Sequence, residues 1–316
     1  MKNTILTFCC ILLQQSLFAE NKDWLIDGSP YKTEVNLSSD KKQIELTNGL
    51  LRRSFSLTPN GATIALDNLM TGQNELRAVR PEAVLVINGK EYPVGGLEGQ
   101  PVHNFLTKDF LSGMQLCDSA FVLAGYTVSE TKERFPWKPN EAWISNRYPW
   151  PVPGKRITFT YRAPRKIVDE CKGLTIRIVY ELYDGAPILS KWIEIENNGQ
   201  KAVTLDSFKS EVLALVETAP KVHYGEPHEV RMMAQKTGYY TEDYRKRPVQ
   251  TDAPRDYIDR FTQLFVVTDY AMGGDMEAMK DNPAVRWVFD HPEYEFTGIR
   301  YYGQYKPARL EVTPLL

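Results

Sequence analysis

The densest group of side chains that could do chemistry is the heptapeptide HYGEPHE. It brings His223, Glu226 and His228 within six residues, and such imidazole and carboxylate groups serve as metal ligands and as proton carriers. The spacing argues against a metal site, because residues 223 and 228 would lie on opposite faces of a strand and Pro227 interrupts the run. We therefore expect no metal ion and no cofactor, and we interpret this segment and His103 as a polar ligand-lining site.

Signatures of familiar enzymes are missing from the sequence. It contains no G-x-S-x-G nucleophile elbow, no H-E-x-x-H, no C-x-x-C and no EF-hand loop. A glycosidase needs two carboxylates across the scissile bond; Glu194 and Glu196 share a strand face, but a polar sheet surface explains them. We predict no catalytic residue. A stand-alone sugar epimerase or lyase remains the alternative, in which a histidine (His103, His223 or His228) and a glutamate carry protons across the concave face of a sheet.

Residues 133–155 form an irregular segment with five prolines and three tryptophans. A long loop in a compact domain is usually functional or disordered, and the tryptophans argue against disorder. We predict that Trp137, Trp143, Tyr148 and Trp150 contact a carbohydrate or a partner domain, because aromatic faces pack against the apolar face of a pyranose ring. The alternative is that these rings close the open end of the fold.

The elements that must position these residues are strands. From Ile44 to Val94, short extended segments alternate with turn sequences, and Asn88-Gly89 predicts a tight hairpin. From residue 156 to residue 217 apolar and polar residues alternate, which predicts long antiparallel strands of one sheet. Only Glu277–Lys280 fits a helical turn. We predict an all-β fold, a large two-sheet antiparallel β-supersandwich with almost no helix.

Charge and composition limit the kinds of binding partner that we expect for this protein. With 38 basic and 40 acidic residues the formal net charge is −2, which gives no electrostatic reason to expect nucleic acid. No segment after the leader approaches the roughly 20 apolar residues of a transmembrane helix, so we expect no membrane span. We expect residues 20–316 to form a single domain, in which Cys117 and Cys171 are either paired or free.

The first 19 residues have the features of a secretory signal peptide. Lys2 supplies a positive start, Ile5–Leu13 is apolar, and Ala19 is a small residue suited to cleavage. The sequence therefore predicts an exported protein, periplasmic or extracellular.

Two stretches resemble the N-terminal β-supersandwich of melibiase-type α-galactosidases and related exported glycoside hydrolases. They read LTNGLLRRSFSLTPNGATIALDNLMTGQNELRAVRPEAVLVINGKEYPVGGL (residues 46–97) and VYELYDGAPILSKWIEIENNG (residues 179–199). The resemblance extends less specifically over the chain after the leader, and it implies a galactose-mutarotase-like sandwich. In such enzymes a (β/α)₈ barrel with the catalytic aspartates follows this domain. The present sequence ends where that barrel would begin, so we transfer no catalytic residue.

Together these features predict an exported, carbohydrate-associated β-sandwich. It would correspond to the accessory domain of an α-galactosidase-like glycoside hydrolase and would be non-catalytic alone, with a galactoside-type glycan or a catalytic barrel as its partner. The alternatives are the stand-alone epimerase or lyase described above and a structural docking scaffold.

Overall fold

The computed structural model describes residues 23–100, 106–138, 149–163 and 171–215, and beyond them only the strand segments β15 to β19. Strands dominate this part of the chain, and α2 (Lys108–Gly113) is its only helix. The prediction of an all-β fold with almost no helix is confirmed. Among the described residues, no helix has the length and apolar character needed to cross a membrane.

The strands within the described residues form five sheets. Their bounds, in chain order, are β1 Glu34–Leu37, β2 Gln43–Thr47, β3 Leu51–Ser56, β4 Ala62–Asn68, β5 Gln73–Asn74, β6 Leu76–Ala78, β7 Ala83–Ile87, β8 Lys90–Val94, β9 Val122–Glu130, β10 Gly154–Arg162, β11 Leu174–Tyr183, β12 Leu189–Asn197, β13 Leu205–Lys209, β14 Glu211–Leu215, β15 Lys236–Thr237, β16 Tyr240–Thr241, β17 Phe265–Val266, β18 Val285–Phe289 and β19 Ala308–Val312. The sheet orders are β1-β2-β3-β4-β5, β12-β11-β10-β9, β13-β7-β8, β18-β19-β14-β6 and β16-β15-β17.

The predicted hairpin at Asn88-Gly89 joins β7 to β8. Asn88 has φ 51° and Gly89 has φ 74°, and Ile87 pairs with Lys90 across the turn. Two successive positive φ angles match the right-handed twist of the flanking strands, which is why this dipeptide favours tight hairpins.

The longest strands form the four-stranded sheet β12-β11-β10-β9, whose neighbours are all antiparallel. Ile178 lies between Phe159 and Ile193 in register, and Val179 lies between Thr158 and Trp192. Side chains of the first row face the protein core and those of the second lie on the opposite face, because successive residues of a strand point to opposite sides. On that opposite face Thr158 and Trp192 are partly exposed, whereas Val179 is buried.

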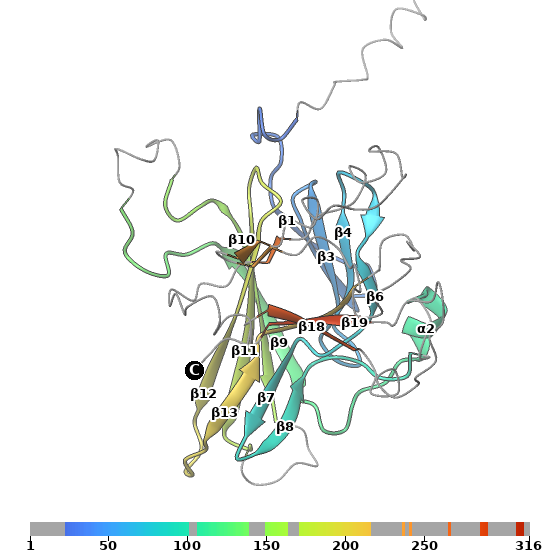
Figure 1. Cartoon of the computed structure of the whole chain (residues 1–316), viewed down its shortest axis with the longest axis vertical. Coiled ribbons are helices and arrows are strands. Elements are labelled where there is room, and N and C mark those ends of the chain that lie inside the picture. The colour runs from blue at the N-terminus through green and yellow to red at the C-terminus, as the bar shows by residue number, and fades with distance from the viewer. Residues whose placement is uncertain are drawn as a thin grey trace, which may run out of the picture.

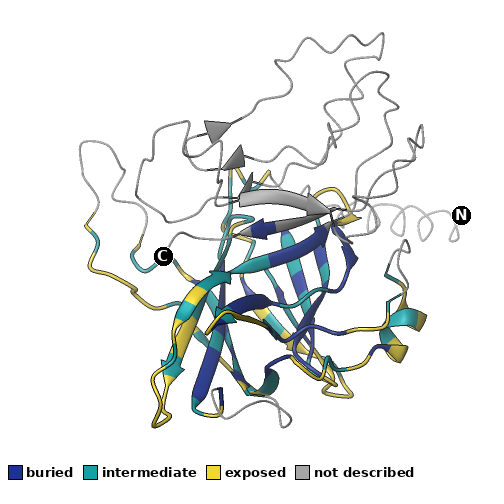
Figure 2. Cartoon of the chain, turned by 60° about the horizontal axis from the view of Figure 1, so that its bottom comes forward, coloured by how far each residue is buried: buried dark blue, intermediate teal, exposed yellow. Residues whose placement is uncertain are grey.

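One apolar core joins this sheet to the sheets of β1–β5 and β13-β7-β8. The core cluster takes Ile44 and Phe55 from the first of these, Leu85 from the second, and Phe159 from the four-stranded sheet. The Phe55 and Phe159 rings lie 4.9 Å apart. Figure 1 shows the long β9–β12 strands facing the blue strands across the molecule, and Figure 2 shows the buried positions on the inward sides. This is the layered β-sandwich that the alternation predicts.

The chain changes sheets between β13 and β14, which corrects the prediction that residues 156–217 form one sheet. Leu205 and Phe208 pair with β7, whereas Ala214 pairs with β6 and Leu213 with β19. Alternation alone cannot show this, since it marks a strand and its faces but not its partner. Of the apolar run Val212–Val216 that was expected to be buried, the described side chains of Val212, Leu213 and Ala214 are buried.

Helix α2 lies where no helix was expected. The Thr107 hydroxyl accepts a hydrogen bond from the backbone N–H of Phe110 and so caps the helix start. Leu111 packs against a second apolar cluster that contains Ile64 and Met114. With six residues the helix is too short to show a 3.6-residue period. The predicted helical turn at Glu277–Lys280 lies outside the described residues.

No disulfide joins the two described cysteines, Cys117 and Cys171. Cys171 is buried in the core, and Cys117 is partly exposed, with its sulfur 3.1 Å from the Ser119 hydroxyl. Of the two states left open by the sequence, the structure has the one without a disulfide between Cys117 and Cys171.

Candidate functional site

The structure describes two of the predicted contact residues, Trp137 and Trp150. The other predicted site residues all lie outside the described residues: Trp143, Tyr148, His103, His223, Glu226 and His228.

Trp137 and Trp150 are neighbours in space. Their ring centroids are 5.2 Å apart and the ring planes are inclined by 53°. Phe135 lies against the same Trp150 indole, also at 5.2 Å, with an angle of 44°. The indole N–H of Trp150 donates a hydrogen bond of 3.3 Å to the backbone carbonyl of Phe135. Trp150 is therefore the centre of a ring cluster, which we call the aromatic platform (Phe135, Trp137 and Trp150).

The aromatic platform lies in the connection between β9 and β10, which are antiparallel neighbours. Lys155 stands opposite Glu130 at the end of the ladder and forms an ion pair with it. Beyond that pair, the Thr131 hydroxyl donates a 2.6 Å hydrogen bond to the Val152 carbonyl. These side-chain contacts join the two ends of the β9–β10 connection next to the ladder, close to the residues of the aromatic platform.

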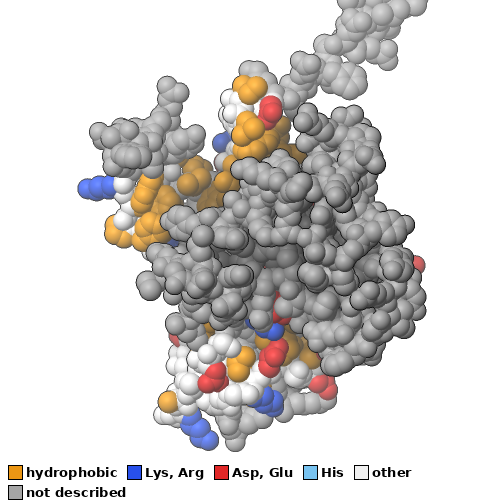
Figure 3. Space-filling view, in the orientation of Figure 1, with side chains coloured by type: hydrophobic (Ala, Val, Ile, Leu, Met, Phe, Trp, Pro, Cys, Tyr) orange, Lys and Arg blue, Asp and Glu red, His pale blue; other side chains and the backbone are white. Residues whose placement is uncertain are grey.

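The aromatic platform is accessible to solvent. Phe135 is 48% exposed, and both indoles are partly exposed. In Figure 3 apolar side chains gather on the left of the molecule, where Figure 1 places the β9–β10 connection, with Lys or Arg side chains at the edge. Exposed rings grouped in this way are typical of an interaction surface rather than of a core.

A fourth ring, Trp192, lies on the outer face of β12 and is close to two guanidinium groups. The central carbons of Arg134 and Arg156 are 4.9 and 5.1 Å from its centroid, within the range of cation–π attraction. The buried Glu181 carboxylate accepts from Arg156 over 2.6 and 2.7 Å and fixes that side chain. Because Arg134 immediately precedes Phe135, it connects the aromatic platform to the outer face of the sheet.

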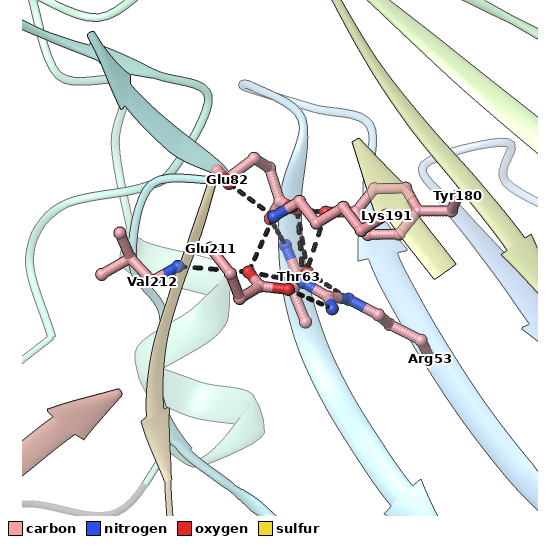
Figure 4. A network of polar contacts seen from close by, with 7 residues as sticks. All are labelled: Arg53, Thr63, Glu82, Tyr180, Lys191, Glu211 and Val212. Carbon is pink, nitrogen blue, oxygen red and sulfur yellow. Dashed lines mark hydrogen bonds and ion pairs between the residues drawn. The ribbon is translucent and has the colours of Figure 1, made fainter. Parts of the chain in front are cut away.

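A cluster of charged and polar side chains is enclosed between the sheets (Figure 4). The Arg53 guanidinium donates to both carboxylate oxygens of Glu211, at 2.7 and 3.2 Å. The Lys191 ammonium donates to the Glu211 carboxylate at 2.7 Å and to the backbone carbonyl of Glu82 at 2.5 Å. We call this group the buried ion network; its members are Arg53, Thr63, Glu82, Tyr180, Lys191 and Glu211.

Glu82 supplies the second carboxylate of the buried ion network. Its carboxylate accepts hydrogen bonds from the backbone N–H and hydroxyl of Thr63 and from the Tyr180 hydroxyl. One of its oxygens also lies 3.5 Å from the guanidinium of Arg53. Two cations thus face two carboxylates, and the side chains of Arg53 and Glu82 are only 3% and 1% exposed. Such complete mutual pairing indicates a structural role, because an unpaired charge at this depth would be costly.

The ionisation of the buried ion network reflects this pairing. Burial opposes the ionisation of Glu211, but attraction to Arg53 and Lys191 exceeds it and lowers the pKa of Glu211 from 4.5 to about 2. Burial lowers the pKa of Lys191, against the opposing attraction of Glu211 and Glu82. Burial likewise raises the pKa of Tyr180 well above its ordinary value. The carboxylate of Glu211 is therefore ionised throughout the physiological pH range.

The outer face of the four-stranded sheet also carries Glu194 and Glu196. Arg177 lies 2.5 Å from the Glu196 carboxylate and 3.9 Å from that of Glu194, so these carboxylates belong to a charged, exposed sheet surface. Within the described ranges, no group of three or more His, Cys, Asp or Glu side chains is arranged to hold a metal ion.

Comparison of the chain with protein-family models, with curated proteins and with solved structures gives no significant match.

Four residues of these clusters, Phe135, Trp192, Arg53 and Lys191, were not predicted as site residues, although the sequence contains signals for them. Phe135 is two positions before Trp137 in the same loop, and Trp192 alternates with inward-facing residues of β12. Arg53 lies on the same face of β3 as Leu51 and Phe55, so a cation on an apolar strand face was visible in the sequence, as was Lys191 on β12. Their anionic partners were not visible, because Glu211 is 158 residues from Arg53.

Proposed function

We propose that this protein is an exported glycan-binding β-sandwich, and that the aromatic platform is its contact surface for sugar. The observation that carries the proposal is the grouping of Phe135, Trp137 and Trp150 on a solvent-accessible loop, with Trp150 in contact with both other rings. A pyranose ring presents a face of C–H groups, and rigid aromatic rings bind such faces at a low cost in conformational entropy.

The contacts among the described residues of the β9–β10 connection support binding. Contacts at its base and the hydrogen bond from the Trp150 indole to the Phe135 carbonyl hold the rings before a ligand arrives. Preorganised side chains lose less entropy on binding, and more of the contact free energy therefore remains as affinity. A galactoside is the expected ligand, because the axial hydroxyl of galactose leaves a continuous apolar patch on the opposite face of the ring.

We further propose that the chain corresponds to the accessory sandwich of an α-galactosidase-like glycoside hydrolase and does not hydrolyse glycans itself. The resemblance of residues 46–97 and 179–199 supports this assignment, and both stretches fall on strands of the sandwich, from β3 to β8 and from β11 to β12. The expected activity is therefore binding, either to a glycan or to a catalytic barrel.

The test is calorimetric titration of the protein with galacto-oligosaccharides. Trp150→Ala removes the central ring of the aromatic platform and Trp137→Ala removes a lateral one; we expect each to weaken binding about tenfold or more, as truncation of a central aromatic contact residue does. Trp24→Ala, the same substitution in the lead-in to β1, is the matched control and should bind normally. Unfolding midpoints establish that each variant is folded. Undiminished affinity in the two folded platform variants would contradict the proposal.

A further inference from the structure

Glu181 is an acidic residue buried on the outer face of the four-stranded sheet. Successive residues of β11 point to opposite sides, so Glu181 shares this face with Arg177. The Arg177 side chain is 35% exposed, whereas that of Glu181 is only 3% exposed. Acidic side chains are seldom buried so deeply unless they are paired, and the partners of Glu181 lead to the start of the β9–β10 connection.

Three groups donate hydrogen bonds to the Glu181 carboxylate. Arg156 stands directly opposite on β10, and its guanidinium contacts one carboxylate oxygen over 2.6 and 2.7 Å. The backbone N–H of Lys132 donates to the same oxygen at 3.5 Å, and the Tyr183 hydroxyl donates to the other oxygen at 3.0 Å. The carboxylate therefore joins β10 and β11 to a residue of the β9–β10 connection.

The segment of residues 132–134 is attached to the sheet at two points. At the first, the Lys132 N–H donates to the buried carboxylate, and the Lys132 carbonyl accepts from the Arg156 guanidinium at 3.4 Å. At the second, the Arg134 guanidinium lies 4.9 Å from the ring centroid of Trp192, within the range of cation–π attraction. The next residue along the chain belongs to the aromatic platform, so these attachments lie directly beside it in the sequence.

We propose that Glu181 is a positioning residue for the aromatic platform, which holds the start of the β9–β10 connection in place before a ligand binds. Phe135 transmits the effect, because its backbone carbonyl accepts the hydrogen bond from the Trp150 indole and its ring contacts the same indole. Glu181 acts through Arg156 and Lys132 rather than through contact with the sugar. This inference rests on the proposed glycan binding and adds a residue outside the contact surface that determines affinity.

The substitution Glu181→Gln keeps the size of the side chain but removes its negative charge, which weakens its hydrogen bonds to Arg156 and Lys132. The platform is then in its binding arrangement for a smaller fraction of the time, and the apparent affinity falls by that fraction. We expect the affinity for galactotetraose to fall about three- to tenfold. The loss should appear as slower association with an unchanged dissociation rate, because the bound complex keeps its contacts. Trp150→Ala removes a contact and should instead speed dissociation.

Two measurements test the proposal. Stopped-flow fluorescence with galactotetraose gives both rate constants, and hydrogen exchange of the ligand-free protein should show faster exchange of the amides of residues 131–137 in Glu181→Gln. Arg156→Gln breaks the same pair from its less buried side and should have the same effects. The double variant should show no further loss, because the two groups act as one pair. Ile176→Val, on the core side of β11, is the control, because it lowers stability but should leave both measurements unchanged.

The outcomes separate this inference from the proposed function. An unchanged association rate in Glu181→Gln, or exchange of residues 131–137 no faster than in the wild-type protein, would overturn the positioning role and leave glycan binding intact. Failure of the wild-type protein to bind galactotetraose would overturn glycan binding at the aromatic platform. Hydrogen exchange of the ligand-free variants would then still decide whether Glu181 holds the connection.

Discussion

The substitution Glu211→Gln tests the buried ion network. It keeps the size of the side chain but removes the negative charge that faces Arg53 and Lys191. The pKa of Glu211 is lowered from 4.5 to about 2, and at about 1.4 kcal/mol per pKa unit the ionised form contributes roughly 3 kcal/mol of stability. Breaking a buried ion pair from one side costs about 3–5 kcal/mol in other proteins. We therefore expect the free energy of unfolding to fall by roughly 3–4 kcal/mol.

The assay is urea unfolding followed by tryptophan fluorescence at neutral pH, with the slope against urea concentration required to stay constant. Glu130→Gln is the matched control, because its side chain is 74% exposed and its ion pair with Lys155 lies at the surface. That variant should change the free energy of unfolding by less than about 0.5 kcal/mol. A loss below about 1 kcal/mol in Glu211→Gln would refute the view that this carboxylate holds two buried cations.

The pH dependence gives an independent check. Because the pKa of Glu211 is lower in the folded state, its stabilising effect is present above pH 4.5 and is lost as the pH falls from 4.5 toward 2. The stability difference between wild type and Glu211→Gln should therefore narrow across this interval. A difference that is as large near pH 2 as at pH 7 would show that it arises from packing rather than from charge.

Two further predictions concern the sandwich itself. Phe55→Ala should lower the free energy of unfolding by about 3–5 kcal/mol in the same urea assay, because the Phe55 ring is fully buried between Phe159 and Tyr180; a loss under about 1 kcal/mol would contradict the assigned core. Gly89→Ala should cost about 1 kcal/mol through backbone strain alone, since Gly89 has φ +74° and its missing Cβ would meet nothing within 4 Å. Gly113→Ala, equally uncrowded but without a positive φ, is its control and should be neutral; equal effects of the two would disprove the turn geometry.

The sequence was sufficient to predict strands and their faces. Alternation in β10 and β11 places Phe159 and Ile178 in the core, and Asn88-Gly89 predicts a hairpin that the structure contains. These features depend on residues close together in the chain, through pleat geometry and turn chemistry.

The pairing of strands was harder to predict, because it depends on distant residues. The change of sheet between β13 and β14 follows from partners in β7, β6 and β19, for which the local sequence contains no signal. The aromatic platform is an intermediate case. The composition of the loop indicated the importance of Trp137 and Trp150, but the role of Phe135 as their neighbour required coordinates.

The buried ion network also has a consequence for the order in which the protein is made. Arg53 precedes Glu211 by 158 residues, which a ribosome adding roughly 5–20 residues per second needs about 8–30 s to synthesise. Throughout that interval Arg53 lacks one of its two carboxylate partners, and Lys191 emerges before β14 as well. Enclosing two such cations without Glu211 is unfavourable. The charge pairing in the interior of the sandwich can therefore be completed only after Glu211 has been synthesised.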